Sequence, residues 1–452
     1  MNFSKKNYDL STFGVKHNKT NKFYVRKTRS FFSHQQLALA FLAFLFSLGI
    51  LTSIQAQDGF KQFSGVVLDS QTEKPLTFAS LLVNDTNIST ISNSDGEFLL
   101  KIPDSIIDAR ITVSFIGYHK KIIPLSEFKK KRTRIMLIPS ITTLPEISLS
   151  LPTDAKALVK ETLEKKGDNN LNEHSIMTAF YREIIKKRKK NVSLAEAIVN
   201  VYKQPYSSLK KDNIKLYKAR KSTDYTKLDT LALKLQGGPY NALYIDLMKY
   251  PEYMFTNDVI DLYSFYFGPS TTINEKPVYV VNFKQRNEVT EPLYYGKLFI
   301  DAKTLALTSA VYSLNVENKE LTSKLFVKKK PKDVFVYPTQ AAYRVDYREK
   351  DGRWYYGYSN VQLTFKIKRK GKIFNSIYSL VSEMAITDWK VNADKEKVKF
   401  KERLRPSVII SDEASGFSDP EFWGAYNVIE PEKSIESAIN KIRRQLKKIS
   451  KS

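Results

Sequence analysis

An alternation of apolar and polar residues between Leu262 and Trp389 is the feature that most constrains how this 452-residue chain can fold. Val361, Leu363, Phe365 and Ile367, for example, are separated by single polar residues. A period of two is typical of strands that bury one face and expose the other. The segments Lys350–Arg353 and Lys370–Gly371 have the composition of hairpin turns. The region is therefore predicted to be an antiparallel meander packed on one side.

Helical patterns flank this region. Thr153 or Asp154 can cap a helix that runs through Lys166, with Gly167 as its end. An amphipathic, basic stretch from Pro431 onward predicts a closing helix whose apolar side covers part of the sheet. The other expected elements are strands over residues 176–186 and 192–203, and a short helix over residues 240–249 that stops at Pro251.

A smaller set of strands precedes the helix at residue 154. Short β-like runs with turn residues between them indicate a small antiparallel sandwich. The expected strands are 63–68, 78–83, 97–102, 111–116 and 134–138. Asp95 and Gly96 are expected to form a tight hairpin between residues 90–92 and 98–100, because both residue types tolerate a positive φ.

Five motifs stand in order in this first region: Gly65–Asp69, Glu73–Leu76, Ala79–Leu81, Asn93–Phe98 and Phe115–Tyr118. In this order they resemble carboxypeptidase-regulatory-like domains, which are transthyretin-like, seven-stranded β-sandwiches. The resemblance implies a fold and an accessory role in peptidases, surface binding proteins or outer-membrane receptors. It does not imply a reaction.

The second region carries a weaker set of motifs: Thr178–Glu183, Leu235–Tyr240, Gly296–Asp301 and Phe422–Asn427. They are similar to uncharacterised envelope domains of Gram-negative bacteria that follow such a sandwich. The stretch from Ile300 to Leu307 also looks like lipoprotein-carrier half-barrels. The expected fold is therefore mainly β or α+β: the sandwich, then a larger antiparallel-sheet domain with flanking helices, with a half-barrel as an open alternative.

The N-terminus has the pattern of an export signal. Residues 1–34 are strongly basic, Leu37–Ile54 is almost entirely apolar, and cleavage is expected after Ala56. An uncleaved anchor is the alternative, because 18 apolar residues can barely span a bilayer. No membrane-spanning segment is expected after cleavage. The predicted divisions are a signal peptide at 1–56, the sandwich at 57–138, a linker at 139–153 and the α+β domain at 154–452.

The chain is poor in the residues that most hydrolases and metal sites use. It contains no cysteine and four histidines, of which only His119 and His174 follow the signal. Neither begins a His-x-x-Glu motif, and the two lie in different predicted domains. A zinc carboxypeptidase is therefore not expected, and neither a metal nor a cofactor is predicted.

Paired carboxylates are the one catalytic arrangement left open by the sequence. Several acids lie inside apolar patterns, where a charge is costly unless it is paired. We expect structural salt bridges rather than catalysis. The acids are Glu183, Glu196, Asp246 and Asp301, and the expected partners are Arg182 and Arg344.

The formal net charge of +26 points to anionic partners. Export argues against nucleic acid, so we expect envelope lipid, lipopolysaccharide or glycan, and an outer-membrane protein as a further partner. Lysine clusters at residues 129–132, 186–190 and 328–330 are expected in loops or at hairpin ends.

Two aromatic-rich strands are the candidates for ligand contact, because aromatic rings suit sugars and acyl chains. The candidate residues are Tyr263, Phe265, Tyr266, Trp354, Tyr355 and Tyr356. The sequence thus predicts an exported, non-enzymatic envelope protein that binds or assembles at the periplasm or outer membrane. The alternatives are a hydrolase of polymers that uses paired carboxylates, and a lipid carrier with an apolar trough under the sheet.

Overall fold

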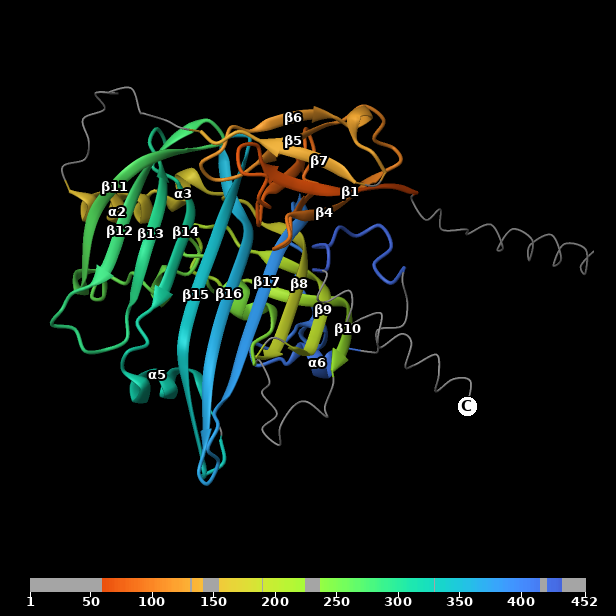
Figure 1. Ribbon diagram of the computed structural model, residues 1–452. Helices are drawn as coiled ribbons and strands as arrows, with labels where there is room; N and C mark the ends of the chain where they lie inside the picture. Colours follow the sequence, from red (N-terminus) through yellow and green to blue (C-terminus); the bar gives the residue numbers. More distant parts are fainter. Residues whose placement is uncertain are drawn as a thin grey trace, which may run out of the picture. The chain divides into compact units, whose positions relative to one another are not determined.

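A ten-stranded antiparallel sheet forms the framework of the larger part of the chain (Figure 1). The structure is a computed structural model that describes residues 59–130, 132–140, 154–188, 190–223, 236–328, 330–414 and 421–432. The strands follow the order β10-β9-β8-β17-β16-β15-β14-β13-β12-β11, so the sheet is open, with β10 and β11 at its edges. The antiparallel meander predicted from the alternation is confirmed, and the same sheet also includes three strands, β8, β9 and β10, that precede the alternating region.

The strands of this sheet are longest in its centre. Their bounds are β8 Ser175–Lys187, β9 Lys190–Lys203, β10 Asn213–Thr223, β11 Tyr263–Ile273, β12 Lys276–Gln285, β13 Tyr294–Asp301, β14 Leu307–Leu314, β15 Val334–Lys350, β16 Arg353–Arg369 and β17 Ser376–Val391. The turn between β15 and β16 has Asp351 at φ 50° and Gly352 at φ 75°, as a two-residue hairpin requires.

The helical segments are shorter than the sequence predicts. They are α2 Ala155–Glu164, α3 Lys166–Asn169, α4 Pro239–Leu243, α5 Lys319–Phe326 and α6 Ile410–Glu413, with 3₁₀ turns at Leu125–Glu127, Pro251–Tyr253, Ile260–Leu262 and Phe400–Glu402.

Two of the predicted helix boundaries are wrong. Asp154 does cap α2, since its side chain accepts the N–H of Lys156 at 2.8 Å. Gly167, however, lies inside α3 instead of ending the first helix. The helix that starts at Pro239 ends at Leu243, and Pro251 begins a 3₁₀ turn, a first-turn position where its missing N–H does not matter.

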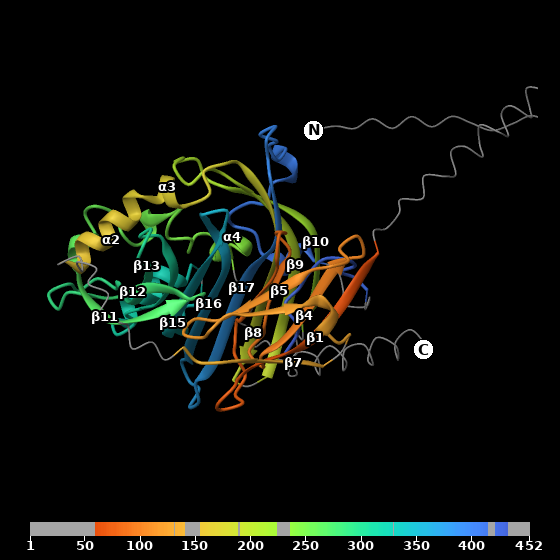
Figure 2. The ribbon, with the colours of Figure 1, turned by 90° about the horizontal axis from the view of Figure 1, so that it is seen from above.

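One face of the sheet carries most of the core. Tyr181, Val281, Leu298 and Tyr356 point to this inner face and belong to one hydrophobic cluster with residues of α2 and α4. Figure 2 shows α2, α3 and α4 on the same side of the sheet. Because successive residues of a strand point to opposite faces, the neighbours of these core residues lie on the outer face.

Seven strands form the first region, as predicted, in a three-stranded sheet β4-β1-β7 and a four-stranded sheet β3-β2-β5-β6. Their bounds are β1 Phe60–Asp69, β2 Ser80–Val83, β3 Ser89–Ile91, β4 Glu97–Pro103, β5 Arg110–Ser114, β6 Lys121–Pro124 and β7 Thr133–Leu137. The expectation of a purely antiparallel sandwich is wrong in one place, because β1 and β7 pair in parallel.

The predicted hairpin at Asp95–Gly96 is also wrong. Strands β3 and β4 belong to different sheets, so the turn connects the two layers of the sandwich. Gly96 has φ 72°, and the Asn93 side chain accepts the N–H groups of Asp95 and Glu97 at 2.9 Å each. An Asx turn therefore replaces the hairpin, since the side-chain oxygen satisfies the turn's backbone donors.

Residues 421–432 pack between the sandwich and the outer face of the large sheet. Asn427 pairs with the backbone of Lys101 on β4, accepting its N–H at 2.7 Å and donating to its carbonyl at 2.9 Å. The ring of Trp423 packs edge-on against Phe180 of β8, with centroids 5.7 Å apart. Ile91, Phe180, Tyr358 and Trp423 thus share one hydrophobic cluster.

Three predictions fall outside the described residues. They are the signal peptide at 1–56, the linker from residue 141 onward, and the closing helix from residue 433 onward.

Candidate functional site

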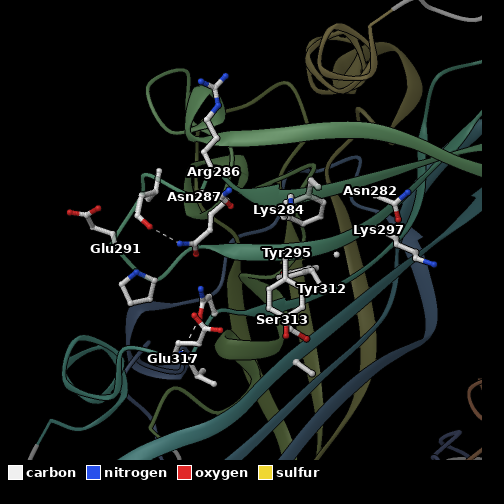
Figure 3. Close-up of a pocket in the computed structure, with 18 of the residues that line it drawn as sticks. Asn282, Lys284, Arg286, Asn287, Glu291, Tyr295, Lys297, Tyr312, Ser313 and Glu317 are labelled. Carbon is white, nitrogen blue, oxygen red and sulfur yellow. Dashed lines mark hydrogen bonds between the residues drawn. The ribbon is translucent and has the colours of Figure 1, made fainter.

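A groove of about 1030 Å³ lies on the outer face of strands β11 to β14 (Figure 3). Side chains that alternate with the core residues of these strands line it. They form two rows that cross neighbouring strands in register. The first row is Tyr266, Asn282, Lys297 and Val311, and the second is Lys284, Tyr295 and Ser313.

The register brings an aromatic ring and two ammonium groups together. Lys284 on β12 stands directly opposite Tyr295 on β13, and Lys297 lies two residues further along β13 on the same face. Tyr295 and Tyr266 are 50% and 51% exposed, so their rings are open to a ligand. Figure 3 shows Tyr295 in the groove, with Lys284 above it and Lys297 to its right.

Two loops close one end of the groove. The first loop, between β12 and β13, is held by Gln285, which accepts the N–H of Leu293 at 3.1 Å and donates to the carbonyl of Val289 at 2.9 Å. The second leads from β14 into α5, where Asn318 caps the helix by accepting the N–H of Leu321 at 3.1 Å. The groove is therefore framed by loops whose backbones are anchored.

Charge is distributed unevenly along the groove. Glu291 and Glu317 line the end formed by the loops, whereas Lys284 and Lys297 lie over the strands. In the part of the chain that the structure describes, the side chains of these two lysines make no ion pair or hydrogen bond. An exposed ring between two unpaired ammonium groups is suited to a ligand with a flat apolar face and anionic substituents.

Of the six aromatic candidates from the sequence, only Tyr266 lies on this groove. Phe265 is half-buried and Tyr263 is buried, with its hydroxyl accepting the N–H of Tyr294 at 3.3 Å. The rings of Trp354, Tyr355 and Tyr356 are buried and belong to the large hydrophobic cluster. The sequence missed Lys284, Tyr295 and Lys297, because a strand's alternation shows which residues share its face but not which residues stand opposite them.

The predicted acids are held in place by buried partners. Glu196 accepts the Nε of Arg182 at 2.8 Å through one oxygen and the Nε of Arg220 at 2.9 Å through the other. Arg182 also contacts Glu383 at 3.3 Å and donates to the carbonyl of Ile429 at 2.6 Å. The guanidinium of Arg182 therefore links three strands to the segment 421–432.

Asp246 belongs to a second buried cluster. Its carboxylate accepts the ammonium of Lys203 at 2.7 Å and the hydroxyls of Tyr206 and Tyr347 at 3.0 and 2.9 Å. Lys203 also donates to Asp212 at 2.8 Å. Although burial opposes the charge, these two carboxylates raise the pKa of Lys203.

The remaining predicted charges have local roles. Asp301 caps a turn by accepting the N–H groups of Lys303 and Thr304 at 3.0 and 2.7 Å. Arg344 donates to Asp346 at 2.8 Å and lies 5.6 Å from the ring of Phe78. Neither residue lines the groove.

Glu183 differs from the other acids. It is 4% exposed and accepts the hydroxyl of Tyr181 at 2.9 Å. Burial raises the pKa of Glu183 to about 7. The side chain lies on the inner face beside Tyr181 and does not line the groove, so a role in the groove's chemistry has no geometric support.

The described residues hold neither a metal-binding cluster nor a membrane-spanning helix. No group of three or more His, Asp or Glu side chains there is arranged to hold a metal ion. Within the same residues, no helix has the length and apolar character needed to cross a bilayer.

Comparisons with known proteins give matches to solved structures and to one family model. Among curated proteins, none matches the chain. The solved structures that match include three at 10% identity. They are a putative outer membrane lipoprotein-sorting protein domain from Vibrio parahaemolyticus (55% of this chain, 94% of that one, TM-score 0.24), a LolA superfamily protein from Nitrosomonas europaea (56% and 99%, 0.23) and a DUF1329 family protein from Desulfovibrio piger (53% and 95%, 0.23). At these TM-scores the likeness defines neither the fold nor the function of this chain.

The first region matches a family model. The model of the CarboxypepD_reg-like domain covers residues 63–149, which include β1 to β7 from Phe63 onward. The match agrees with the observed seven-stranded, two-layered sandwich. Residues 63–149 are therefore a CarboxypepD_reg-like domain.

Proposed function

We propose that this is an exported, non-enzymatic protein of the cell envelope that binds an anionic saccharide in the groove on β11 to β14. The observation that carries the proposal is the pair of lysines around an exposed tyrosine ring, brought together by the register of β12 and β13. A sugar ring can stack on Tyr295, while phosphate or carboxylate substituents accept hydrogen bonds from Lys284 and Lys297.

The four acids predicted from the sequence lie away from the groove, which favours a binding role over hydrolysis by those acids. A glycosidase needs two carboxyl groups that flank the bond to be cleaved. Glu183, Glu196, Asp246 and Asp301 are all at most 4% exposed, and none of them lines the groove. Their partners are an arginine, a lysine, a tyrosine and backbone donors, as expected of groups that hold the fold together.

The inner face of the sheet supports saccharide binding over lipid carriage. A carrier of acyl chains would need apolar space on that face. The space next to the inner face is instead filled by packed rings, among them Tyr312, Tyr347 and Tyr356, and by residues from the segment that contains α4. The site that is open lies on the opposite face, and its lining is aromatic and charged.

Location and partners belong to the same proposal. The expected signal peptide and the basic charge favour the periplasm or the outer membrane, where lipopolysaccharide supplies phosphorylated sugars. The sandwich at residues 63–149 would serve as the accessory module. An outer-membrane protein stays a predicted partner.

Titration calorimetry with three probes tests this proposal: the deacylated core saccharide of lipopolysaccharide, inorganic phosphate, and a neutral maltooligosaccharide. We expect the core saccharide to bind best. Lys297→Gln and Tyr295→Ala should each weaken its binding by about tenfold, since a charge-assisted hydrogen bond or a stacked ring contributes about 1.5 kcal/mol.

Two variants outside the groove serve as matched controls. Tyr253→Ala removes a ring that is 46% exposed, and Lys324→Gln removes a lysine whose side chain is 68% exposed. Both should leave the affinity unchanged. Equal affinity for the charged and neutral saccharides, or an affinity that neither groove variant lowers, would contradict the proposal.

A further inference from the structure

One end of the large sheet gathers three lysine-rich segments that are far apart in the sequence. We define the basic tip as the described residues of three segments. They are the β8–β9 turn with its flanking residues (186–190), the segment that leads into β15 (328–336), and the β16–β17 turn with the adjoining strand ends (366–377). Lys187 stands opposite Tyr378, and Val334 stands opposite Arg369. The N–H of Arg188 donates to the carbonyl of Ile377 at 2.9 Å, which joins two of the three segments. Figure 1 shows β15, β16 and β17 running together to this end.

The end of the tip is apolar. Ile373 is 90% exposed and Phe374 is 81% exposed, and both lie in the turn that follows Gly371, whose φ is 81°. Ile377 and Phe335 extend this apolar surface along the strands at 43% and 41% exposure. Turns in water usually carry small or polar residues, so two adjacent large apolar side chains at a hairpin end need an apolar partner.

Cations surround this apolar turn. Asp333 lies 3.5 Å from Arg369 and Glu432 lies 3.6 Å from Lys186, so the two acids at the tip already face a cation. Lys370 and Lys372, which come just before Ile373 and Phe374 in the turn, are exposed. The described cations of the tip are Lys186, Lys187, Arg188, Lys190, Lys328, Lys330, Lys332, Lys366, Lys368, Arg369, Lys370 and Lys372.

We propose that the basic tip inserts into the surface of an anionic phospholipid bilayer. The side chains of Ile373 and Phe374 enter the boundary of the acyl chains, and the surrounding lysines bind the headgroup phosphates. This combination of an apolar end and a basic collar is the one that interfacial membrane binding requires. The tip and the groove involve different residues, so this inference stands apart from the proposed function.

A tryptophan reporter tests insertion directly. The three native tryptophans, Trp354, Trp389 and Trp423, are all buried, so Phe374→Trp adds a single exposed indole at the tip of the full chain. With vesicles of phosphatidylcholine and phosphatidylglycerol, we expect the fluorescence of this indole to shift to shorter wavelength and to be quenched by brominated acyl chains.

The matched control is Leu209→Trp. Leu209 is 94% exposed and follows the far end of β9, which begins beside the tip at Lys190 and ends at Lys203. Its indole should be neither shifted nor quenched. Because the control sits in the same full chain, any membrane attachment through the N-terminal residues affects both reporters equally.

Affinity measurements test the two contributions separately. Ile373→Ser combined with Phe374→Ser should weaken vesicle binding of the tip by at least about tenfold, since a buried apolar side chain contributes about 1.5 kcal/mol or more. Lys370→Gln and Lys372→Gln should each weaken it about fivefold, the equivalent of about 1 kcal/mol per lysine at an anionic surface. Ile107→Ser, a change at an apolar side chain that is 75% exposed in the sandwich, should have no effect.

Three outcomes would overturn the inference. One is an indole at position 374 that stays unquenched with anionic vesicles. The second is equal quenching with vesicles of pure phosphatidylcholine. The third is self-association of the chain that the double serine variant abolishes without any vesicle binding, which would assign the tip to a protein contact. Groove variants such as Tyr295→Ala should leave the quenching unchanged, so this inference and the proposed function can fail separately.

Discussion

Removal of the Lys203 ammonium should destabilise the fold more than removal of any exposed lysine ammonium. Lys203 donates to Asp212 at 2.8 Å and to Asp246 at 2.7 Å, and the side chains of all three residues are at most 1% exposed. The substitution Lys203→Met keeps most of the side-chain volume. It leaves two carboxylates in the core with tyrosine hydroxyls and backbone N–H groups as their remaining partners.

The expected loss of unfolding free energy is about 3–5 kcal/mol, which is typical when one partner of a buried ion pair is removed. Whole domains are stable by about 5–15 kcal/mol, so the variant should lose a large share of its stability. Equilibrium unfolding in urea, followed by far-UV circular dichroism, measures the difference.

Lys324→Met is the control for this measurement. Lys324 pairs with Glu320 at 2.8 Å, but both side chains are mostly exposed, so its loss should cost at most about 1 kcal/mol. If Lys203→Met costs no more than Lys324→Met, the buried cluster does not stabilise the fold in the way its geometry indicates.

Three further predictions follow from buried groups and one turn. Burial raises the pKa of Glu183 from 4.5 to about 7, so between these pH values the folded state keeps a proton that the unfolded state releases. The free energy of unfolding should therefore fall as the pH rises from 4.5 to 7. Glu183→Gln should remove about 3 kcal/mol of this pH dependence, as measured by urea unfolding across that range. Asn427→Ala leaves the buried N–H and carbonyl of Lys101 without their partners, so unfolding free energy should drop by about 2 kcal/mol and limited proteolysis should cut residues 421–432 faster. Gly96→Ala would place a Cβ 2.7 Å from a carbonyl oxygen at a positive φ, and it should lower the melting temperature more than Gly117→Ala, where no atom lies within 4 Å.

The local features of the fold could be predicted from the sequence. The period of two across residues 262–389 predicts strands with one buried face, and the structure has seven strands there. The motifs from Gly65 to Tyr118 predict the sandwich, which a family model also identifies. These patterns are readable because strand alternation and turn chemistry depend on residues that are close in sequence.

The turn at Asp95–Gly96 shows where local reasoning fails. The dipeptide is compatible with a hairpin, but its two flanking strands join different sheets. β3 pairs with β2, and β4 pairs with β1. These contacts with earlier strands decide which sheet each of the two strands joins. A turn residue can permit a reversal of the chain, but it cannot choose the partner of the strands that follow.

The sequence by itself determined that this chain is β-rich, basic, free of cysteine and divided into a sandwich and a larger sheet. Only the tertiary structure decided which side chains share a site. Lys284, Tyr295 and Lys297 meet because of the register between β12 and β13. The basic tip forms because three segments that are far apart in the sequence meet at the same end of the large sheet. The physical reason is that the hydrophobic pattern specifies the face of a residue, whereas strand order and register, which depend on contacts between distant segments, specify its neighbours.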